Sequence, residues 1–381
     1  MLRVIAFIAA AGALSALVYY LLALWAVRRF RRRPAANHGF TPPVSILKPL
    51  HGLDPQIYEC LRSHCVQEYP EYEIIFGLDD KNDPALPVVQ RLQQEFPQHA
   101  LQIVICPQVL GANRKVSNLV RMLEHARHQY VLINDADICV PPDYLRRVMG
   151  EFRDPKVGVV TALYRGLPGR TLASRLEALG IADFAAGVLV APMWFGSMDF
   201  ALGSTVAMSR HALDAIGGLR PLVDHLADDY ELGQRISHAG FKVVLANVVV
   251  DTALPDYSFR GFFRHQLRWA RTIRAVRPWS YFGTVLSFGL PWAVLAVIAA
   301  GSSLARWCWA LLVAVALARI AVTLATAYVL RDRRLLRDLW LIPLRDLLAV
   351  LTWAGAYLSN TVEWRGQRFI LKDGKLAPID L

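Results

Sequence analysis

Cysteine is scarce in this sequence, and the few cysteines form no pattern. The 381 residues contain five, which are scattered, odd in number and without C-x-x-C spacing. This arrangement gives no sign of a zinc site. We expect reduced thiols that pack as small hydrophobic side chains in a cytosolic domain. They are Cys60, Cys65, Cys106, Cys139 and Cys308.

The sequence also lacks a recognisable nucleic-acid-binding module, although its formal net charge is +11. No Lys/Arg tract alternates with aromatic residues in the pattern of such a module, which argues against DNA or RNA as a partner. Many arginines instead stand close to apolar runs. This pattern favours an anionic membrane surface or a phosphorylated ligand. Internal repeats and low-complexity linkers are absent as well.

Hydrophobic runs, by contrast, are long and frequent, and 55% of the residues are hydrophobic. Residues 4–27 carry no charge, are long enough to cross a bilayer, and run into the basic sequence RRFRRR. A cleaved signal peptide has a shorter apolar core and a small-residue cleavage site, so we interpret 1–33 as an uncleaved anchor with a basic stop. Residues 281–304 and 308–330 are predicted to be two further spans. The positive-inside rule places the residues after Arg28 in the cytoplasm.

Two features of the C-terminal membrane region need an explanation. Arg319 lies within a predicted span, where it is tolerable if it faces a helix partner or a polar cavity. The last apolar segment, 339–360, is interrupted by Arg345 and Asp346 and is followed by a basic tail, 361–381. This segment either crosses the membrane or is re-entrant or interfacial. A crossing would leave the basic tail outside, which the positive-inside rule disfavours.

Between the anchor and these spans, apolar runs alternate with segments of helical periodicity. The strand-like runs are VSILKP, YEIIFGLDD, LQIVIC, YVLINDAD and VGVVTALY. Residues 84–96 and 113–127 have the spacing of helices. Strand and helix in alternation predict an α/β domain with a mostly parallel sheet and helices on both faces. Such sheets bind ligands beyond the carboxyl ends of their strands.

Two of the predicted strands end in pairs of acidic residues. Asp135 and Asp137, one residue apart, can hold Mg²⁺ or Mn²⁺ with help from the diphosphate oxygens of a ligand. A solvated Asx turn explains the same pair. Asp79 and Asp80 could accept hydrogen bonds from a nucleoside, or could simply shape the turn DDKNDP.

Further polar residues follow in order along the chain. Lys115, in LGANRKVSNL, is well placed to reach phosphate oxygens, although a lysine at a helix start is often only a surface residue. Asp228 and Asp229 stand in the first turn of a predicted helix, where they serve either the helix dipole or catalysis. The segment HQLRWARTIR then supplies Arg268 and Trp269.

Taken together, these segments resemble an inverting nucleotide-sugar glycosyltransferase of the large family 2 superfamily with the GT-A fold. Within it, nearly the whole chain resembles the ceramide glucosyltransferase branch, most closely the bacterial hopanoid biosynthesis-associated glycosyltransferases. The matching segments occur in the order of that branch: SILKPLHGLDP, FGLDDKNDPA, GANRKVSNL, FGSMDFALGSTVAMSR, LADDYELG, RHQLRWARTIR and EWRG. One position departs from the superfamily signature, which has Gln or Arg three residues before the Arg-Trp pair. Here His265 occupies it, and Gln266 is one place late.

The resemblance implies a role for each candidate residue. Asp80, with Asp79, would contact the uridine. Asp135 and Asp137 would bind Mg²⁺ or Mn²⁺ together with the ribose and diphosphate of the donor. The general base would be Asp229, next to Asp228 in the donor site. Lys115 and Arg268 would offset charge on the leaving UDP. Trp269 and His265 would complete the site.

The resemblance also implies an organisation and a set of partners. The expected parts are the anchor (1–33), a cytoplasmic GT-A (Rossmann-like) domain (41–257), an amphipathic helix at the inner membrane face (258–279), membrane segments (280–360) and the tail (361–381). We expect a multi-pass protein of the bacterial inner membrane, in contact with its lipids. The donor would be UDP-GlcNAc and the acceptor a hopanoid polyol such as bacteriohopanetetrol, with acceptor contacts in 183–205. Ceramide with UDP-glucose is the alternative.

Three other functions fit the sequence less well. A processive polysaccharide synthase would share the aspartates and the Arg-Trp pair, but should need more membrane spans to form its channel. A non-catalytic receptor or transporter would leave the polar segments unexplained. A phosphotransfer enzyme of the D-x-D type would place its nucleophilic aspartate early in the chain, not after a fourth strand.

Overall fold

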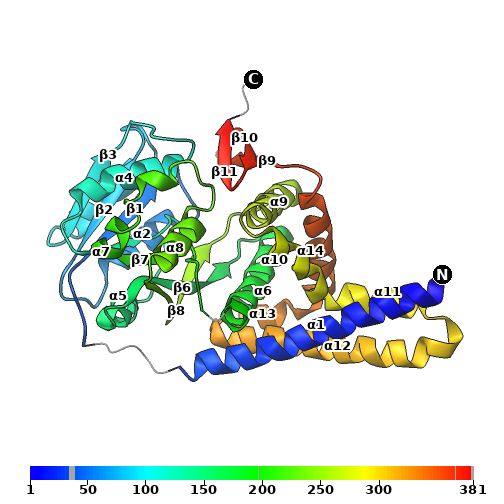
Figure 1. The fold of residues 1–381 in the computed structure, drawn as a ribbon. Helices are drawn as coiled ribbons and strands as arrows, with labels where there is room; N and C mark the ends of the chain where they lie inside the picture. The colour runs from blue at the N-terminus through cyan, green and yellow to red at the C-terminus, as the bar shows by residue number, and fades with distance from the viewer. Residues whose placement is uncertain (34–38, 196, 365, 379–381) are drawn as a thin grey trace.

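The computed structural model of this chain describes residues 1–33, 39–195, 197–364 and 366–378. Figure 1 shows an α/β domain on one side and a group of long helices on the other, with the N-terminus at the far end of these helices. A small C-terminal sheet lies above helix α9 (Phe259–Val276), between the two parts.

An eight-stranded sheet forms the centre of the α/β domain. Its strands are β1 (Val44–Leu50), β2 (Tyr72–Leu78), β3 (Ala100–Ile105), β4 (Tyr130–Ile133), β5 (Ile138–Cys139), β6 (Val157–Leu167), β7 (Val206–Ser209) and β8 (Lys242–Ala253), in the order β3-β2-β1-β4-β7-β6-β8-β5. Strand β1 runs parallel to β2 and β4, and β6 runs parallel to β8, whereas β7 is antiparallel to both of its neighbours. The predicted mostly parallel sheet is confirmed, and so are all five strands indicated by the sequence.

Helices cover both faces of this sheet, as the alternation predicted. They are α2 (Ile57–Cys65), α3 (Leu86–Glu95), α4 (Arg114–His125), α5 (Tyr144–Met149), α7 (Arg210–Asp214) and α8 (Asp228–His238), with short 3₁₀ turns η1 (Gly150–Arg153) and η2 (Arg220–Leu222). One hydrophobic core packs α2, α3 and α5 against the sheet. The core on the other face includes α4 and α8 and continues into the long apolar helices.

The long helices belong to the two ends and the middle of the chain. They are α1 (Leu2–Arg31), α6 (Leu172–Phe195), α11 (Gly289–Ala299), α12 (Gly301–Val329) and α14 (Ile342–Ala356), with shorter α10 (Pro278–Gly283), η3 (Thr284–Ser287), α13 (Arg334–Arg337) and η4 (Leu339–Leu341) between them. Among the described residues, four segments are long and apolar enough to cross a membrane: Leu2–Arg31, Leu172–Met193, Ala305–Val329 and Leu339–Ala356.

One predicted span is bent, and one apolar helix was not predicted. The bent pair, Pro278–Ser287 and Gly289–Ala299, forms either a broken span or a re-entrant loop. The segment 281–304 is not one straight helix, because the chain bends by 54° between η3 and α11 and turns again at Gly301, whose φ of +62° suits glycine. Leu172–Met193 is an apolar helix of spanning length that was not predicted from the sequence. Its charged residues obscured it, and 61% of its most apolar stretch is buried inside the protein.

Arg319 faces helix partners, which is the condition under which we expected it to be tolerated. Its guanidinium donates hydrogen bonds to Asp346 of α14 at 2.8 and 3.1 Å, and to Asp183 of α6 at 3.0 Å. The three side chains therefore tie α12, α14 and α6 together. A charge at this depth is favourable only when it is paired in this way.

Helix α14 bears on the ambiguous segment 339–360. Its 15 residues extend over about 22 Å, which is less than the roughly 30 Å of a hydrocarbon core. In Figure 1 it lies beside α9 rather than along the pair formed by α1 and α12. Together with η4, however, α14 forms the segment Leu339–Ala356, which is long and apolar enough to cross, so a crossing and a re-entrant or interfacial segment both stay predictions.

The basic tail folds into a second sheet of three antiparallel strands, β9 (Thr361–Trp364), β10 (Gln367–Lys372) and β11 (Lys375–Pro378). This sheet binds the arginine-rich face of α9. Arg264 pairs with Glu363 at 3.3 Å, and Arg271 donates to the Thr361 carbonyl at 2.6 Å. Some of the arginines that predicted an interfacial helix are thus held by the chain's own C-terminal segment.

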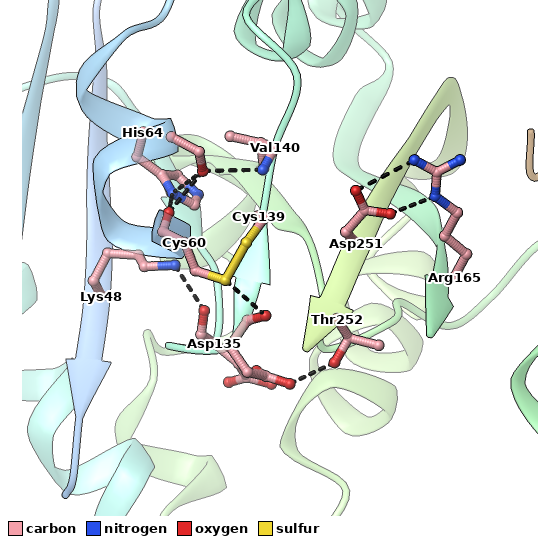
Figure 2. The surroundings of a disulfide bond; sticks show 11 residues. Lys48, Cys60, His64, Asp135, Cys139, Val140, Arg165, Asp251 and Thr252 are labelled. Carbon is pink, nitrogen blue, oxygen red and sulfur yellow. Dashed lines mark hydrogen bonds and ion pairs between the residues drawn. A yellow bond between two sulfur atoms is a disulfide. The ribbon is translucent and has the colours of Figure 1, made fainter. Parts of the chain in front are cut away.

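The prediction that all five cysteines are reduced thiols is wrong for two of them. Cys60 and Cys139 form a disulfide between α2 and β5 (Figure 2). Their separation of 79 residues gave no signal, because only the fold brings their Cα atoms within 4.1 Å. The other three, Cys65, Cys106 and Cys308, are buried free thiols as expected.

Candidate active site

The turn that follows β4 is held by a buried asparagine. Asn134 Nδ2 donates to the Tyr144 hydroxyl at 3.0 Å and to the Ser204 carbonyl at 2.6 Å, while its Oδ1 lies 3.2 Å from His64 Nε2. Burial lowers the pKa of His64 well below its ordinary value, so the ring is neutral. Groups from α2, α5 and the segment before β7 therefore fix the point where Asp135 begins.

Asp137, the second acid of this turn, is anchored by strand β8. The Thr252 hydroxyl donates to its carboxylate, and the Ala253 amide donates to its carbonyl at 3.0 Å. Burial, followed by repulsion from Asp135, raises the pKa of Asp137 to about 6. A cation shared by the two carboxylates would relieve this repulsion.

Strand β1 contributes a lysine that the sequence analysis did not select. Lys48 is fully buried, and its Nζ donates to the Asp135 carbonyl at 2.7 Å (Figure 2). Desolvation lowers the pKa of Lys48 to about 7, against the opposing charges of Asp137 and Asp135. The available signal was a single charged residue within VSILKPL, a strand whose seven residues are all buried.

Lys115 links the turn after β4 to the start of α8. Its Nζ lies 2.7 Å from Asp135 Oδ1 and 3.4 Å from Asp228 Oδ2. Desolvation disfavours the ammonium, but the charges of Asp135 and Asp228 outweigh this effect and raise the pKa of Lys115 above its ordinary value. A permanent cation therefore stands between two of the predicted donor-binding acids.

Asp229 faces the same turn across a glycine. A Cβ added to Gly203 would lie 3.1 Å from Asp229 Oδ2 and 3.4 Å from Asp135 Oδ2, so both carboxylates border one backbone position. Burial and the neighbouring Asp228 raise the pKa of Asp229 to about 6. A carboxylate with this pKa is suited to accept a proton near neutral pH.

The acids after β2 differ from each other in their surroundings. Asp80 is exposed, and its Oδ1 accepts hydrogen bonds from the backbone and side chain of Asn82, which is the turn-shaping alternative. Asp79 has two buried carboxylate oxygens without a hydrogen-bond partner among the described residues. The His51 ring nitrogen Nδ1 lies 3.8 Å from Asp79 Oδ2. Of these two acids, Asp79 is therefore the one whose carboxylate oxygens can still accept hydrogen bonds from a ligand.

Helix α9 brings Arg268 and Trp269 toward the sheet. The Trp269 ring packs against Phe184 of α6, with centroids 6.0 Å apart. Desolvation lowers the pKa of Arg268, while the charges of Tyr257, Glu177 and Asp135 act in the opposite direction. Arg268 therefore lies within electrostatic range of the Asp135 carboxylate.

His265 and Gln266 stand where the sequence departs from the superfamily signature. Both contact the buried acid Glu177. Gln266 Nε2 donates to Glu177 Oε2 at 2.6 Å, and His265 Nδ1 lies 3.3 Å from Glu177 Oε1. The histidine contact has an ion-pair distance but not hydrogen-bond geometry, so Nδ1 has no hydrogen-bond partner among the described residues. Glu177 was missed in the sequence, where it is a lone acid between apolar residues.

The structure brings five predicted residues together at one edge of the sheet and leaves others outside this cluster. The cluster consists of Lys115, Asp135, Asp137, Asp228 and Asp229. Asp79 and Asp80 follow β2, two strands from β4 in the sheet. Of the region 183–205, the side chains at 194–196 lie outside the described residues, as does position 365 of EWRG.

The metal-ligand atoms that this cluster offers meet the needs of a hard divalent cation only in part. Carboxylate oxygens are the ligands that Mg²⁺ and Mn²⁺ prefer. Within the described ranges, however, no group of three or more His, Cys, Asp or Glu side chains could hold a metal ion. Asp135 and Asp137 therefore fit a cation that takes its remaining ligands from a bound diphosphate.

Known proteins of similar sequence are glycosyltransferases. A model of glycosyl transferase family 21 matches residues 8–377. Ceramide glucosyltransferase 3 of Caenorhabditis elegans is 25% identical over 240 residues, which is 62% of this chain and 52% of that protein. The ceramide glucosyltransferase of Candida albicans is 30% identical over 144 residues, 31% of this chain and 26% of that protein. The chain thus spans about half the length of its curated relative from Caenorhabditis, and less of the one from Candida.

A solved structure shares the fold. The mannosyltransferase PcManGT from Pyrobaculum calidifontis, in complex with GDP-Man and Mn²⁺, superposes with a TM-score of 0.57 and 23% sequence identity. The match covers 89% of this chain and 99% of that one. This likeness confirms the predicted glycosyltransferase fold and extends beyond the sheet to most of the chain.

Proposed function

The chain belongs to glycosyl transferase family 21, and on that basis we propose that it transfers one sugar from a UDP-sugar to a hydroxyl group of a membrane lipid, with inversion at the anomeric carbon. One observation supports this above the others. Asp229, with its raised pKa of about 6, and Asp135, a donor-binding acid in this proposal, border the same backbone position at Gly203. A base and a diphosphate site so close together suit a direct displacement.

In this proposal the nucleoside lies toward the acids after β2 and the diphosphate lies toward the turn after β4. The unpartnered oxygens of Asp79 would accept hydrogen bonds from the uracil or ribose, with Asp80 at the rim. Lys115 would exchange part of its contact with Asp135 for phosphate oxygens. Asp228, which also contacts Lys115, would keep the ammonium in place during that exchange.

Asp229 would act as the general base. It would take the proton of the acceptor hydroxyl while the hydroxyl oxygen attacks the anomeric carbon from the face opposite UDP. The new glycosidic bond forms as the bond to the diphosphate breaks, and that electron pair leaves with UDP. Lys115 and Arg268 would offset the charge that develops on the leaving group. An α-linked donor then gives a β-glycoside, and no covalent enzyme intermediate is needed.

Asp135 and Asp137 would hold Mg²⁺ or Mn²⁺ together with diphosphate oxygens of the donor. Such an ion would supply positive charge at the leaving diphosphate. The pKa of Asp137, raised to about 6 by burial and by Asp135, indicates that the pair is short of positive charge without one. The solved mannosyltransferase with Mn²⁺ supports the same assignment through its fold alone.

The acceptor we propose is a hopanoid polyol such as bacteriohopanetetrol, with UDP-GlcNAc as donor. It rests on the resemblance of GANRKVSNL, LADDY and LRWARTIR to hopanoid-associated glycosyltransferases. The curated relatives give specific support to the second candidate, glucosylation of ceramide from UDP-glucose. Both acceptors carry a hydroxyl at the membrane surface on an apolar body, which suits an active site placed beside apolar helices.

The deciding experiment supplies purified protein with UDP-GlcNAc or UDP-glucose and with bacteriohopanetetrol or ceramide, in all four pairs. Products are identified by mass. N-acetylglucosaminyl bacteriohopanetetrol is the expected product. Glucosylceramide without any hopanoid product would replace the acceptor and the sugar but keep the reaction. Transfer to neither lipid, with UDP-sugar still bound, would refute the lipid glycosyltransferase proposal.

A further inference from the structure

A small cavity of about 160 Å³ lies between the amphipathic helix α9 and the apolar helices. Its walls come from α6, α9, α14 and the α10–η3 segment. Five aromatic side chains form much of the lining: Phe184, Trp269, Tyr281, Phe288 and Trp353. Trp269 is also the aromatic residue of the Arg-Trp pair, so one wall of the cavity belongs to the candidate active site.

Two polar side chains in this lining have unmet hydrogen-bonding capacity. The Nε and Nη1 atoms of Arg345 and the hydroxyl of Thr352 are buried and have no hydrogen-bond partner among the described residues. The other polar pair of the lining, Glu177 and Gln266, satisfies itself at 2.6 Å. Buried donors are nearly always paired in folded proteins, so these atoms indicate a ligand or ordered water in the cavity.

Arg345 is positioned by packing rather than by an ion pair. Its neighbour Asp346 is already bound to Arg319, which also takes Asp183. The guanidinium of Arg345 instead lies over Gly180 of α6, where an added Cβ would approach Nη2 to 2.5 Å. The two acids balance both arginines in total charge, yet Nε and Nη1 of Arg345 have no hydrogen-bond partner in the described part of the chain.

The cavity is adjacent to the acids of the candidate active site. Phe184 separates it from Tyr164 of β6, and the two rings lie 6.2 Å apart. Burial raises the pKa of Tyr164 well above its ordinary value, and the charges of Asp229 and Glu177 raise it further. Tyr164 therefore lies within electrostatic range of the proposed base and in contact with the aromatic wall of the cavity.

We infer that this cavity is the acceptor subsite, and that Arg345 and Thr352 donate hydrogen bonds to oxygen atoms next to the reacting hydroxyl of the lipid. The inference rests on the proposed function. At about 160 Å³ the cavity is smaller than the roughly 300–1,000 Å³ of sites that enclose a whole drug-sized ligand. The cavity can therefore hold only the part of the lipid acceptor where its polar head joins its apolar body.

The side chains that line the cavity limit which chemical group of the lipid can bind there. The Nε–H and Nη1–H of one guanidinium point in a fixed geometry and suit an oxygen acceptor, such as a second hydroxyl of a polyol or an amide carbonyl. The aromatic rings would pack on the first carbons of the apolar body. An anionic phospholipid headgroup has similar oxygen atoms, and the experiment below separates it from the acceptor.

Two variants test the polar groups and one tests the space. Arg345→Met keeps an unbranched apolar stem but loses the guanidinium donors, and Thr352→Val keeps the shape of the side chain without the hydroxyl. Ala349→Phe fills the cavity, because Ala349 is in its lining. Leu351→Phe is the matched control, since Leu351 lies on the same helix with 51% of its surface exposed. Each variant is assayed with whichever of bacteriohopanetetrol and ceramide the wild type glycosylates.

The expected result is a change confined to the acceptor. KM for the lipid should rise about tenfold for Arg345→Met and more for Ala349→Phe, with a smaller rise for Thr352→Val. UDP binding and the slow hydrolysis of UDP-sugar without acceptor should stay within about twofold of wild type, which also shows that the variants are folded. Leu351→Phe should behave as wild type.

Two results would overturn the inference. One is wild-type KM for the lipid in both Arg345→Met and Ala349→Phe. The other is loss of binding to phosphatidylglycerol vesicles in Arg345→Met with unchanged KM, which would make the cavity a phospholipid site. Failure of the proposed function is distinct, because the wild type itself would then glycosylate neither lipid.

Discussion

The ammonium of Lys115 lies 2.7 Å from the carboxylate of Asp135, joining the first turn of α4 to the turn after β4. Lys115 is the cation that we propose for the donor diphosphate. In the proposed reaction this ion pair is partly exchanged for contacts to the diphosphate. The pair thus explains how three like charges, Asp135, Asp228 and Asp229, are kept close together in a folded protein.

Asp229→Asn should separate binding from catalysis. Asparagine has nearly the same shape but cannot take the acceptor proton, so we expect UDP affinity to be retained and the transfer rate to fall by about 10² or more. Transfer is followed by product formation and binding by titration with UDP. Asp214→Asn, at an exposed aspartate on α7, is the control. Near-normal turnover in Asp229→Asn would mean that another group, Asp228 first, is the base.

The same residue predicts the pH dependence. Asp229 is active as the carboxylate, and its pKa is raised to about 6, so activity should be constant above this value and fall about tenfold per unit as pH drops below it. The rate is measured with saturating donor and metal, because Asp137 also titrates near 6 before a cation binds. A rate that stays constant down to pH 4.5 would contradict the role of Asp229.

Removal of metal should abolish transfer. With Mg²⁺ or Mn²⁺ chelated by excess EDTA, the carboxylates of Asp135 and Asp137 would face the donor diphosphate without a counter-ion, and product formation should stop. Asp135→Ala and Asp137→Ala should be inactive in the presence of metal. Readdition of Mg²⁺ or Mn²⁺ to the chelated wild type is the control. Full activity in EDTA would rule out the metal role.

Removal of the C-terminal sheet should impair catalysis. The amide of Leu376 donates to the Asp224 carbonyl at 2.7 Å, just before the acids of α8, while Glu363 and Thr361 bind α9. A chain that ends after residue 360 loses both connections, so we expect transfer to fall at least about tenfold and the melting temperature to drop. Truncated protein with wild-type kinetics would show that this sheet does not position the site.

Reporter fusions should establish the orientation. The predicted arrangement gives a cytoplasmic signal after Arg33 and after Leu335, and an external signal after Arg306. The Cys60–Cys139 disulfide makes this test sharper, because such bonds persist mainly in oxidising compartments. An external signal after Arg33 would agree with the disulfide and would separate the domain from cytosolic UDP-sugars.

Much of the fold was predictable because its signals are local. The apolar strands and the amphipathic helix α4 follow from the spacing of neighbouring residues, and α1 follows from an uncharged run. Asp135, Asp137, Asp228 and Asp229 were identifiable for a similar reason, since each stands at the end of a strand or at the start of a helix. Residues in such positions border the ligand edge of a parallel sheet whatever the details of packing.

The tertiary structure decided what depends on contacts between distant segments. In the sequence, Lys48 and Glu177 are isolated charges in apolar stretches. In the fold, Lys48 donates to the Asp135 carbonyl. Glu177 contacts both His265 and Gln266. Nε and Nη1 of Arg345 have no hydrogen-bond partner within the described ranges, because Arg319 has already bound the two nearby acids, which come from two other helices. Neighbouring residues cannot encode such pairings, because the energy of a buried charge depends on every group that packs around it.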